Sequence, residues 1–258
     1  MPDAALSVSP ETEMFVVAGP PRALRGELRL RNDSNEKLKL RSVSVRSRER
    51  GKAPPGLEFA NLQVGARLRP GEQAAIPLEL ELNSETAPGI YELETEIGGR
   101  MVPIRAHVTP HVDLRIEPAA VTLLVGSNRT VEHEFIAENA GNVPLPLGER
   151  CEAPLFDSVD FMTAFREGIR KSVGVELKPR FEQIFDQVGR MQVGSLLVHR
   201  ERTTLKPGER RQMSARFELP EDIKPGRHYR ASLELYNATL RVDIYTTEKV
   251  RRRAANKG

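Results

Sequence analysis

The chain repeats its own turn sequences, and this repetition restricts the possible folds more than any other feature. The sequence Leu-Arg-Pro-Gly-Glu at 68–72 returns as Leu-Lys-Pro-Gly-Glu at 205–209. After each copy comes an alternating apolar segment and then, at the same interval, a second Pro-Gly turn followed by Tyr91 or Tyr229. Repetition on this scale indicates that one structural unit was built twice.

The segments between these turns have the pattern of half-buried β-strands. Apolar residues recur at every second position and are interrupted by Gly, Pro and Asn at intervals of about 8 to 12 residues, which favours a sandwich over βαβ units. The first half predicts strands at 24–30, 37–45, 74–82, 91–97 and 101–108. The second half predicts strands at 131–138, 195–200, 212–219, 229–235 and 239–245.

The repeat also predicts the domain organisation. Residues 8–10 correspond to 116–118, and the Asn-containing turn at 31–35 corresponds to 138–142. We expect an N-terminal domain at 1–110, a C-terminal domain at 111–247 and a basic flexible tail at 248–258. The spacing of the later motifs is longer in the second copy, so that copy contains an insertion between Asn142 and Leu205.

This order of turns resembles that of bacterial immunoglobulin-like and fibronectin type III-like modules, and of cytoplasmic modules similar to the major sperm protein fold. The resemblance covers nearly the whole chain except the insertion. It implies an all-β protein of two tandem immunoglobulin-like antiparallel sandwiches, and it implies a spacer or protein-binding role. Turn chemistry specifies a fold and says little about function.

The insertion, at about 154–189, has helical instead of alternating periodicity. Apolar residues three or four apart predict one short helix that Asp157 or Ser158 caps, and a second that begins near Pro179 and ends at Gly189. The insertion holds five of the nine phenylalanines. Burying a Phe stabilises by roughly 1.5 to 3 kcal/mol, so these side chains need an apolar partner.

Two interpretations of this helical pair remain open. Either its apolar stripe covers the sandwich into which the pair is inserted, or part of the stripe docks onto another subunit or protein. The candidate partner-binding residues are Phe161, Met162, Phe165, Ile169, Phe181, Ile184, Phe185 and Val188. An exposed edge strand is a second route to association, and the basic run from Arg46 to Lys52 is placed to oppose such pairing at an edge or loop of the first domain.

Catalytic and ligand-binding chemistry has little support in the sequence. No hydrolase, nucleotide-binding, zinc-protease or calcium-loop motif is present, and we expect no catalytic residue and no cofactor. His107 and His111 are the only closely spaced histidines, and no further ligand type gathers near them. The absence of tryptophan and the 5% aromatic content disfavour glycan binding, although an exported adhesion or glycan-binding module is the alternative function.

Charge and cysteine content bear on partners and compartment. The 39 basic and 36 acidic residues are interleaved, and the basic stretches carry no aromatic residue, so we expect no nucleic-acid contact. With 39% hydrophobic residues and no apolar run of spanning length, the sequence predicts no membrane span.

The single Cys151 excludes an internal disulfide, and the first residues lack a secretory pattern. We therefore predict a cytoplasmic adaptor; the alternative is an exported chain whose signal peptide has been removed.

Overall fold

A computed structural model describes residues 6–8, 14–48, 53–54, 57, 60–126, 128–171, 182 and 192–247. Among these residues the chain divides into two compact units. The first unit spans residues 1–112 with Asn139–Pro144 and Lys206–Gly208, and the second spans Asp113–Glu138, Leu145–Leu205 and residues from Glu209 onward. The predicted boundaries at 110 and 247 remain a prediction, and the predicted tail at 248–258 lies outside the described residues.

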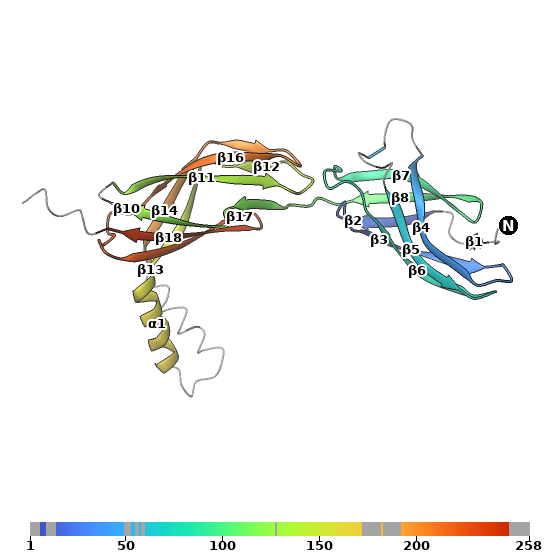
Figure 1. Cartoon of the computed structure of the whole chain (residues 1–258), viewed down its shortest axis with the longest axis horizontal. Helices are drawn as coiled ribbons and strands as arrows, with labels where there is room; N and C mark the ends of the chain where they lie inside the picture. The colour runs from blue at the N-terminus through green and yellow to red at the C-terminus, as the bar shows by residue number, and fades with distance from the viewer. Residues whose placement is uncertain are drawn as a thin grey trace, which may run out of the picture. The chain divides into compact units, whose positions relative to one another are not determined.

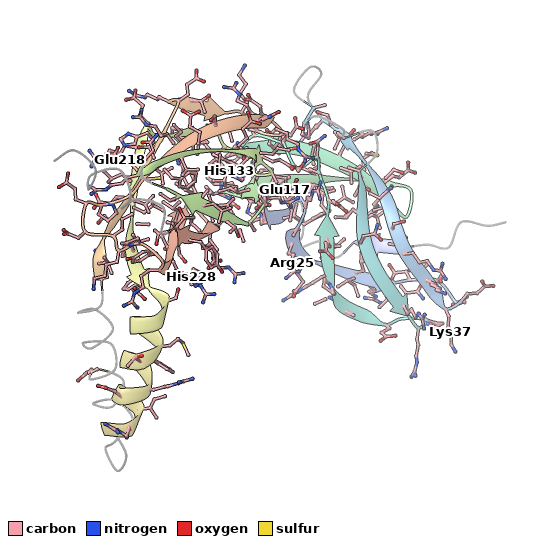
Figure 2. The ribbon with its side chains drawn as sticks, turned by 60° about the vertical axis from the view of Figure 1, so that its left-hand side comes forward. Arg25, Lys37, Glu117, His133, Glu218 and His228 are labelled. Carbon is pink, nitrogen blue, oxygen red and sulfur yellow. The ribbon has the colours of Figure 1, made fainter. Side chains whose placement is uncertain are left out.

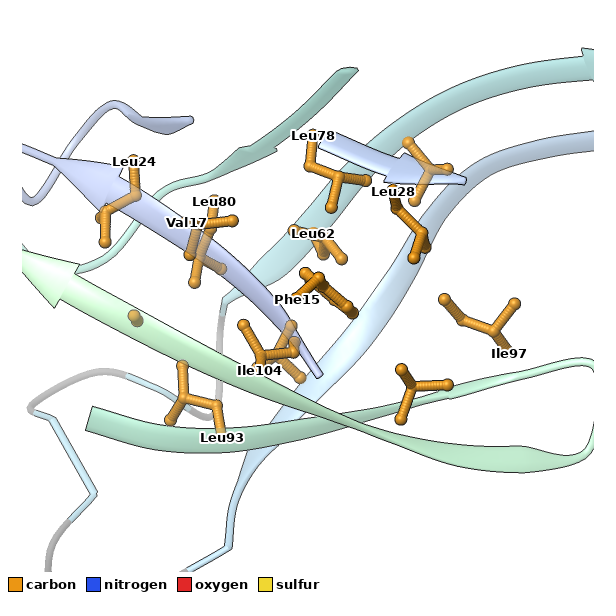
Figure 3. Packing of buried hydrophobic residues seen from close by; sticks show 14 of the residues in the cluster. Phe15, Val17, Leu24, Leu28, Leu62, Leu78, Leu80, Leu93, Ile97 and Ile104 are labelled. Carbon is orange, nitrogen blue, oxygen red and sulfur yellow. The ribbon is translucent and has the colours of Figure 1, made fainter. Parts of the chain in front are cut away.

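The regular secondary structure described in the first unit is mainly β-strand. The strands are β1 (Leu6–Val8), β2 (Phe15–Gly19), β3 (Leu24–Asn32), β4 (Leu38–Ser47), β5 (Asn61–Leu68), β6 (Gln73–Leu80), β7 (Gly89–Ile97) and β8 (Arg100–Val108). Their hydrogen-bonded order is β1-β3-β6-β5-β4-β7-β8-β2, and β2 pairs back onto β3. Alternate residues of these strands point inward, and Figure 3 shows the resulting core of leucine, isoleucine, valine and phenylalanine.

The second unit repeats the same strand order. Its strands are β9 (Leu114–Glu117), β10 (Ala120–Val125), β11 (Thr130–Asn139), β12 (Leu145–Leu147), β13 (Arg150–Asp157), β14 (Gln192–Arg200), β15 (Thr203–Leu205), β16 (Arg210–Glu218), β17 (His228–Leu235) and β18 (Ala238–Thr246). The main sheet runs β9-β11-β16-β14-β13-β17-β18-β10, and β12 pairs separately with β15. One helix, α1 (Ser158–Lys171), follows β13 (Figure 1).

The shared turns hold equivalent hydrogen bonds in both copies of the repeat. Gly71 donates its N–H to the Asn32 carbonyl over 2.8 Å, and Gly208 donates to the Asn139 carbonyl over the same distance. Both glycines have φ near +70°, a backbone conformation that glycine adopts without the steric cost that a side chain brings. The repeated turn is therefore hydrogen-bonded to the last residue of an earlier strand, β3 in the first copy and β11 in the second.

Each unit also has a tyrosine at the start of its second-last strand whose hydroxyl reaches back to the preceding turn. Tyr91 Oη donates to the Ala87 carbonyl over 2.9 Å, and Tyr229 Oη accepts the Lys224 N–H over 2.7 Å. This arrangement is the tyrosine corner of immunoglobulin-like sandwiches, and the strand order is also theirs. The prediction of an all-β, immunoglobulin-like fold is confirmed.

Two interpretations of the sequence need correction. The segment 154–157 belongs to strand β13, where Pro154 lies opposite Ser195, so the insertion begins at Ser158. Proline is tolerated there because β13 pairs with β17 only from Leu155 onward. The basic run is described only from Arg46 to Arg48. Arg46 is not at an edge, because it lies in β4, which β5 and β7 flank, and its Nε lies 2.7 Å from a Glu94 carboxylate oxygen. Arg48 follows the end of β4, and residues 49–52 lie outside the described part of the chain.

Candidate functional site

The helix α1 begins directly where β13 ends. Asp157, the last residue of β13, is buried and lies at the position preceding the helix, so α1 begins where the sequence analysis placed its cap, at Asp157 or Ser158. The Asp157 carboxylate also lies 3.7 Å from the Arg227 guanidinium. From this anchored start α1 contacts β13 and β17 and extends away from the strands of its unit (Figure 1 and Figure 2).

One face of α1 presents apolar side chains to solvent. Met162, Phe165 and Ile169 are 47%, 39% and 38% exposed. Their spacing of three and four residues puts them on a single stripe, which Arg166 and Arg170 flank. We call these three apolar residues the α1 stripe. So much exposed apolar surface on a projecting helix is typical of a contact surface.

A groove lies at the base of the helix, where α1 leaves the sheet. It has a volume of about 590 Å³. Its apolar lining comes from Pro154 and Phe156 of β13, Met162 of α1 and Ala231 of β17. Its polar lining comes from Glu152, Ser158, Arg230, Ser232 and Glu234. We call this the β13–β17 groove; Met162 belongs to both features, so the α1 stripe continues into the groove.

A compact polar cluster adjoins the groove through Arg230. The Asp243 carboxylate lies 2.7 Å from Arg230 Nε and 2.8 Å from His228 Nε2, and the His228 ring stacks on Tyr245 at a centroid distance of 4.3 Å. The hydrogen bond from Arg230, aided by His228, lowers the pKa of the Asp243 carboxyl below its ordinary value. The cluster fixes the orientation of the Arg230 side chain at the rim of the groove.

We predict that this cluster makes the stability of the second unit sensitive to acid. The pKa of Asp243 is lower in the folded than in the unfolded chain, so its contribution is present above about pH 4 and is lost as the pH falls through the folded value. The Asp243→Asn variant should unfold more easily than wild type at pH 7, and this difference should shrink below pH 4. Thermal unfolding of both chains across pH 3–7 measures it; a difference that grows on acidification would contradict the prediction.

The predicted site residues divide between described and undescribed parts of the chain. Met162, Phe165 and Ile169 lie together on α1, and Phe161 lies in the same helix with its side chain outside the described part. Phe181, Ile184, Phe185, Val188 and the second predicted helix lie outside the described residues. Between 172 and 191 the structure describes Glu182 alone, which is exposed and has helical backbone.

The β13–β17 groove was not predicted from the sequence, because its lining comes from strands far apart in the chain. The available signal was the alternation in β17, where Arg230, Ser232 and Glu234 point away from the core. Alternation shows which residues face outward, but strand order decides which outward faces are neighbours.

The polar residues considered earlier do not assemble a metal site in the described chain: no group of three or more His, Cys, Asp and Glu residues there could hold a metal ion. Cys151 is half-buried beside Arg200, whose Nη1 lies 3.5 Å from its sulfur. Burial raises the pKa of the Cys151 thiol, and Arg200 opposes this only in part. Within the described residues no helix is long and apolar enough to cross a membrane.

Comparison with known proteins identifies no family for this chain. No family model matches the chain, and no curated protein matches it. Three similar solved structures are the CupB2 chaperone of Pseudomonas aeruginosa, a titin A168–A169 fragment and the DIP-gamma IG1+IG2 fragment. The chaperone is 10% identical to this chain, the match covers 88% of this chain and 95% of the chaperone, and the TM-score is 0.22. The titin fragment is 9% identical, with 93% and 98% covered and a TM-score of 0.30. The DIP-gamma fragment is 12% identical, with 95% and 99% covered and a TM-score of 0.28. These scores are too low for a functional argument, and the immunoglobulin-like assignment depends on the strand order and the tyrosine corners.

Proposed function

We propose that this protein is a non-catalytic structural or adaptor protein that acts through protein–protein contacts, with the α1 stripe and the β13–β17 groove as one docking surface. The observation that carries the proposal is the exposure of Met162, Phe165 and Ile169 on a helix that extends away from its sheet. A helix that served only to cover its own sandwich would turn this face toward the strands. The helical insertion is thus the principal docking element.

The groove and the helix together favour an amphipathic helix of a partner protein. Pro154, Phe156 and Ala231 contribute apolar lining to the groove, and binding of an amphipathic helix in an apolar groove is a common mode of recognition. Glu152 and Glu234 lie on the strand side of this surface, whereas Arg166 and Arg170 flank the α1 stripe. We therefore expect the partner helix to carry basic residues along one border of its apolar stripe and acidic residues along the other.

The insertion should be removable without loss of the fold. Phe156 of β13 and Gln192 of β14 are paired, so the chain leaves and re-enters the sheet at neighbouring positions. Deleting 158–191 and joining Asp157 to Gln192 with a short Gly-Ser loop should keep the β-sheet circular dichroism spectrum and a cooperative unfolding transition. Unfolding of the second unit on deletion would instead mean that the insertion is part of its core.

We predict that polar substitution of the α1 stripe abolishes partner binding. A photo-crosslinking residue at Phe165 would first identify the partner in cells, and the purified partner would then be titrated against the Met162→Ser/Phe165→Ser/Ile169→Ser variant. Since buried apolar anchors dominate such interfaces, affinity should fall by about 100-fold or more. Thr163→Ala, an exposed α1 position outside the stripe, is the matched control and should bind like wild type. Equal binding by the triple variant would refute the docking role of the stripe.

The cellular compartment is a separate part of the proposal. The chain has one cysteine and therefore no internal disulfide, which is consistent with a reducing compartment such as the cytoplasm. Cell fractionation of the protein expressed from its native reading frame tests this directly. Recovery outside the cytoplasm would favour the alternative of an exported module.

A further inference from the structure

The two units differ at one edge despite their common strand order. In the first unit β2 pairs with β8 on one side and with β3 on the other, through Val17 and Gly26. Its counterpart in the second unit, β10, pairs with β18 and, among the described residues, with no second strand. The hydrogen-bonded circuit of the first unit is therefore open at β10 in the second.

A single position explains this difference. A Cβ atom on Gly26 would overlap the Val16 carbonyl oxygen and lie 2.9 Å from Val17 Cγ1, so β2 approaches β3 because Gly26 has no side chain. Gly26 lies opposite Leu78, and the equivalent pair in the second unit is His133 opposite Ala215. His133, labelled in Figure 2, thus stands where the first unit has glycine, and any side chain there keeps β10 from closing onto β11.

The backbone of β10 has hydrogen-bonding groups directed to this open edge. The carbonyls of Ala119 and Val125 accept N–H groups of Arg241 and Thr247, so odd-numbered residues face β18. Backbone groups alternate sides along a strand. The N–H and C=O groups of Ala120, Thr122 and Leu124 therefore point away from β18, as the equivalent Val16 carbonyl points toward β3.

The side chains of β10 do nothing to block pairing at this edge. The sequence Ala-Val-Thr-Leu-Leu-Val contains no charge, no proline and no glycine, and Leu124 is 71% exposed. The opposite end strand, β9, carries Arg115 and Glu117, whose charges protect an edge in the usual way. An uncharged edge rich in β-forming residues is a template for another strand.

We propose that β10 pairs antiparallel with β10 of a second copy of this chain, about a two-fold axis at Thr122. An axis at Thr122 pairs Thr122 with Thr122 and Ala120 with Leu124 of the second copy. The N–H and C=O groups of these residues that point away from β18 then all form hydrogen bonds across the interface. It sets the large Leu124 beside the small Ala120 on the exposed face. A strand with no charge meets itself without like-charge repulsion, and therefore the second copy is the partner that this edge fits.

Lysine substitution tests the pairing. Thr122→Lys would place two positive charges directly opposite each other across the axis, and we expect the dimer dissociation constant from analytical ultracentrifugation to rise about ten-fold or more. Val16→Lys is the matched control, because Val16 is 49% exposed at the equivalent position of β2 but lies in the closed circuit. It should leave the dissociation constant unchanged.

Hydrogen exchange followed by NMR gives an independent measurement. The amides of Thr122 and Leu124 should exchange more slowly as the wild-type concentration rises, and the Thr122→Lys variant should lose this concentration dependence. The chain lacking 158–191 should still dimerise, which separates this inference from the docking role of α1. A wild-type chain that stays monomeric to millimolar concentration, a dimer unaffected by Thr122→Lys, or β10 protection that appears only with a different protein bound would each overturn it.

Discussion

Replacing Asn32 by alanine should lower the free energy of unfolding by about 2–4 kcal/mol, because the side chain holds the repeated turn together from a fully buried position. Its Nδ2 donates to the carbonyls of Glu36 and Leu68 over 2.7 and 3.2 Å, and its Oδ1 accepts the Ser34 N–H over 3.1 Å. Alanine leaves these backbone groups without the side chain that satisfies them. Urea unfolding followed by circular dichroism measures the loss.

The repeat provides both a replicate and a control for this prediction. Asn139, also fully buried, donates to the Val143 carbonyl over 2.8 Å and accepts the Gly141 N–H over 3.0 Å, so Asn139→Ala should cost a similar amount. Asn35 is exposed in the same turn as Asn32, and Asn35→Ala should change stability by no more than about 0.5 kcal/mol. If Asn32→Ala lowered the free energy of unfolding no more than Asn35→Ala, the buried Asn32 amide would not be what stabilises the turn.

Substituting Gly26 by alanine should destabilise the first unit by about 2–3 kcal/mol. The new Cβ meets the Val16 carbonyl, which is backbone and cannot rotate away, so β2 must separate from β3. Thermal unfolding of the variant against wild type measures the effect. A reduced midpoint together with faster exchange of the β2 amides is the expected result.

His133→Ala is the matched control, because the equivalent strand already carries a Cβ at this position. It removes a half-buried imidazole without any new overlap, so its cost should stay well below that of Gly26→Ala. A Gly26→Ala chain as stable as wild type would show that β2 can withdraw freely, and the explanation of the open β10 edge would then be wrong.

The sequence predicted many of the strands from their alternation, but it also missed strands whose buried and exposed residues alternate without interruption. The strands predicted at 24–30 and 229–235 are found in β3 and β17, whereas β5 and β10 were not predicted. β13 was not predicted as a strand either, and its residues from Pro154 onward were assigned to the helical insertion, because the sequence does not show that they pair with β14 and β17. For the same reason the sequence placed Arg46 at an edge or a loop of the first domain, whereas it lies in β4, which has a neighbouring strand on each side.

For the docking surface, helical spacing was enough to predict one element and one face. Met162, Phe165 and Ile169 were expected on one stripe from their positions alone, since a helix has a fixed period. Whether that stripe covers its own sandwich or faces solvent depends on where α1 leaves the sheet. That direction comes from the start of α1 at the end of β13, beside the buried Asp157.

The sequence by itself determined the turns, their repetition and the alternation of the strands, because these depend on the conformational freedom of glycine and proline and on periodicity within a few residues. Only the tertiary structure decided which strands became neighbours. The β13–β17 groove, the exposed α1 stripe and the open edge of β10 all arise from contacts between residues distant in the chain. The open edge of β10 shows the physical reason. Glycine at 26 or histidine at 133 changes strand pairing only where another strand packs against that position.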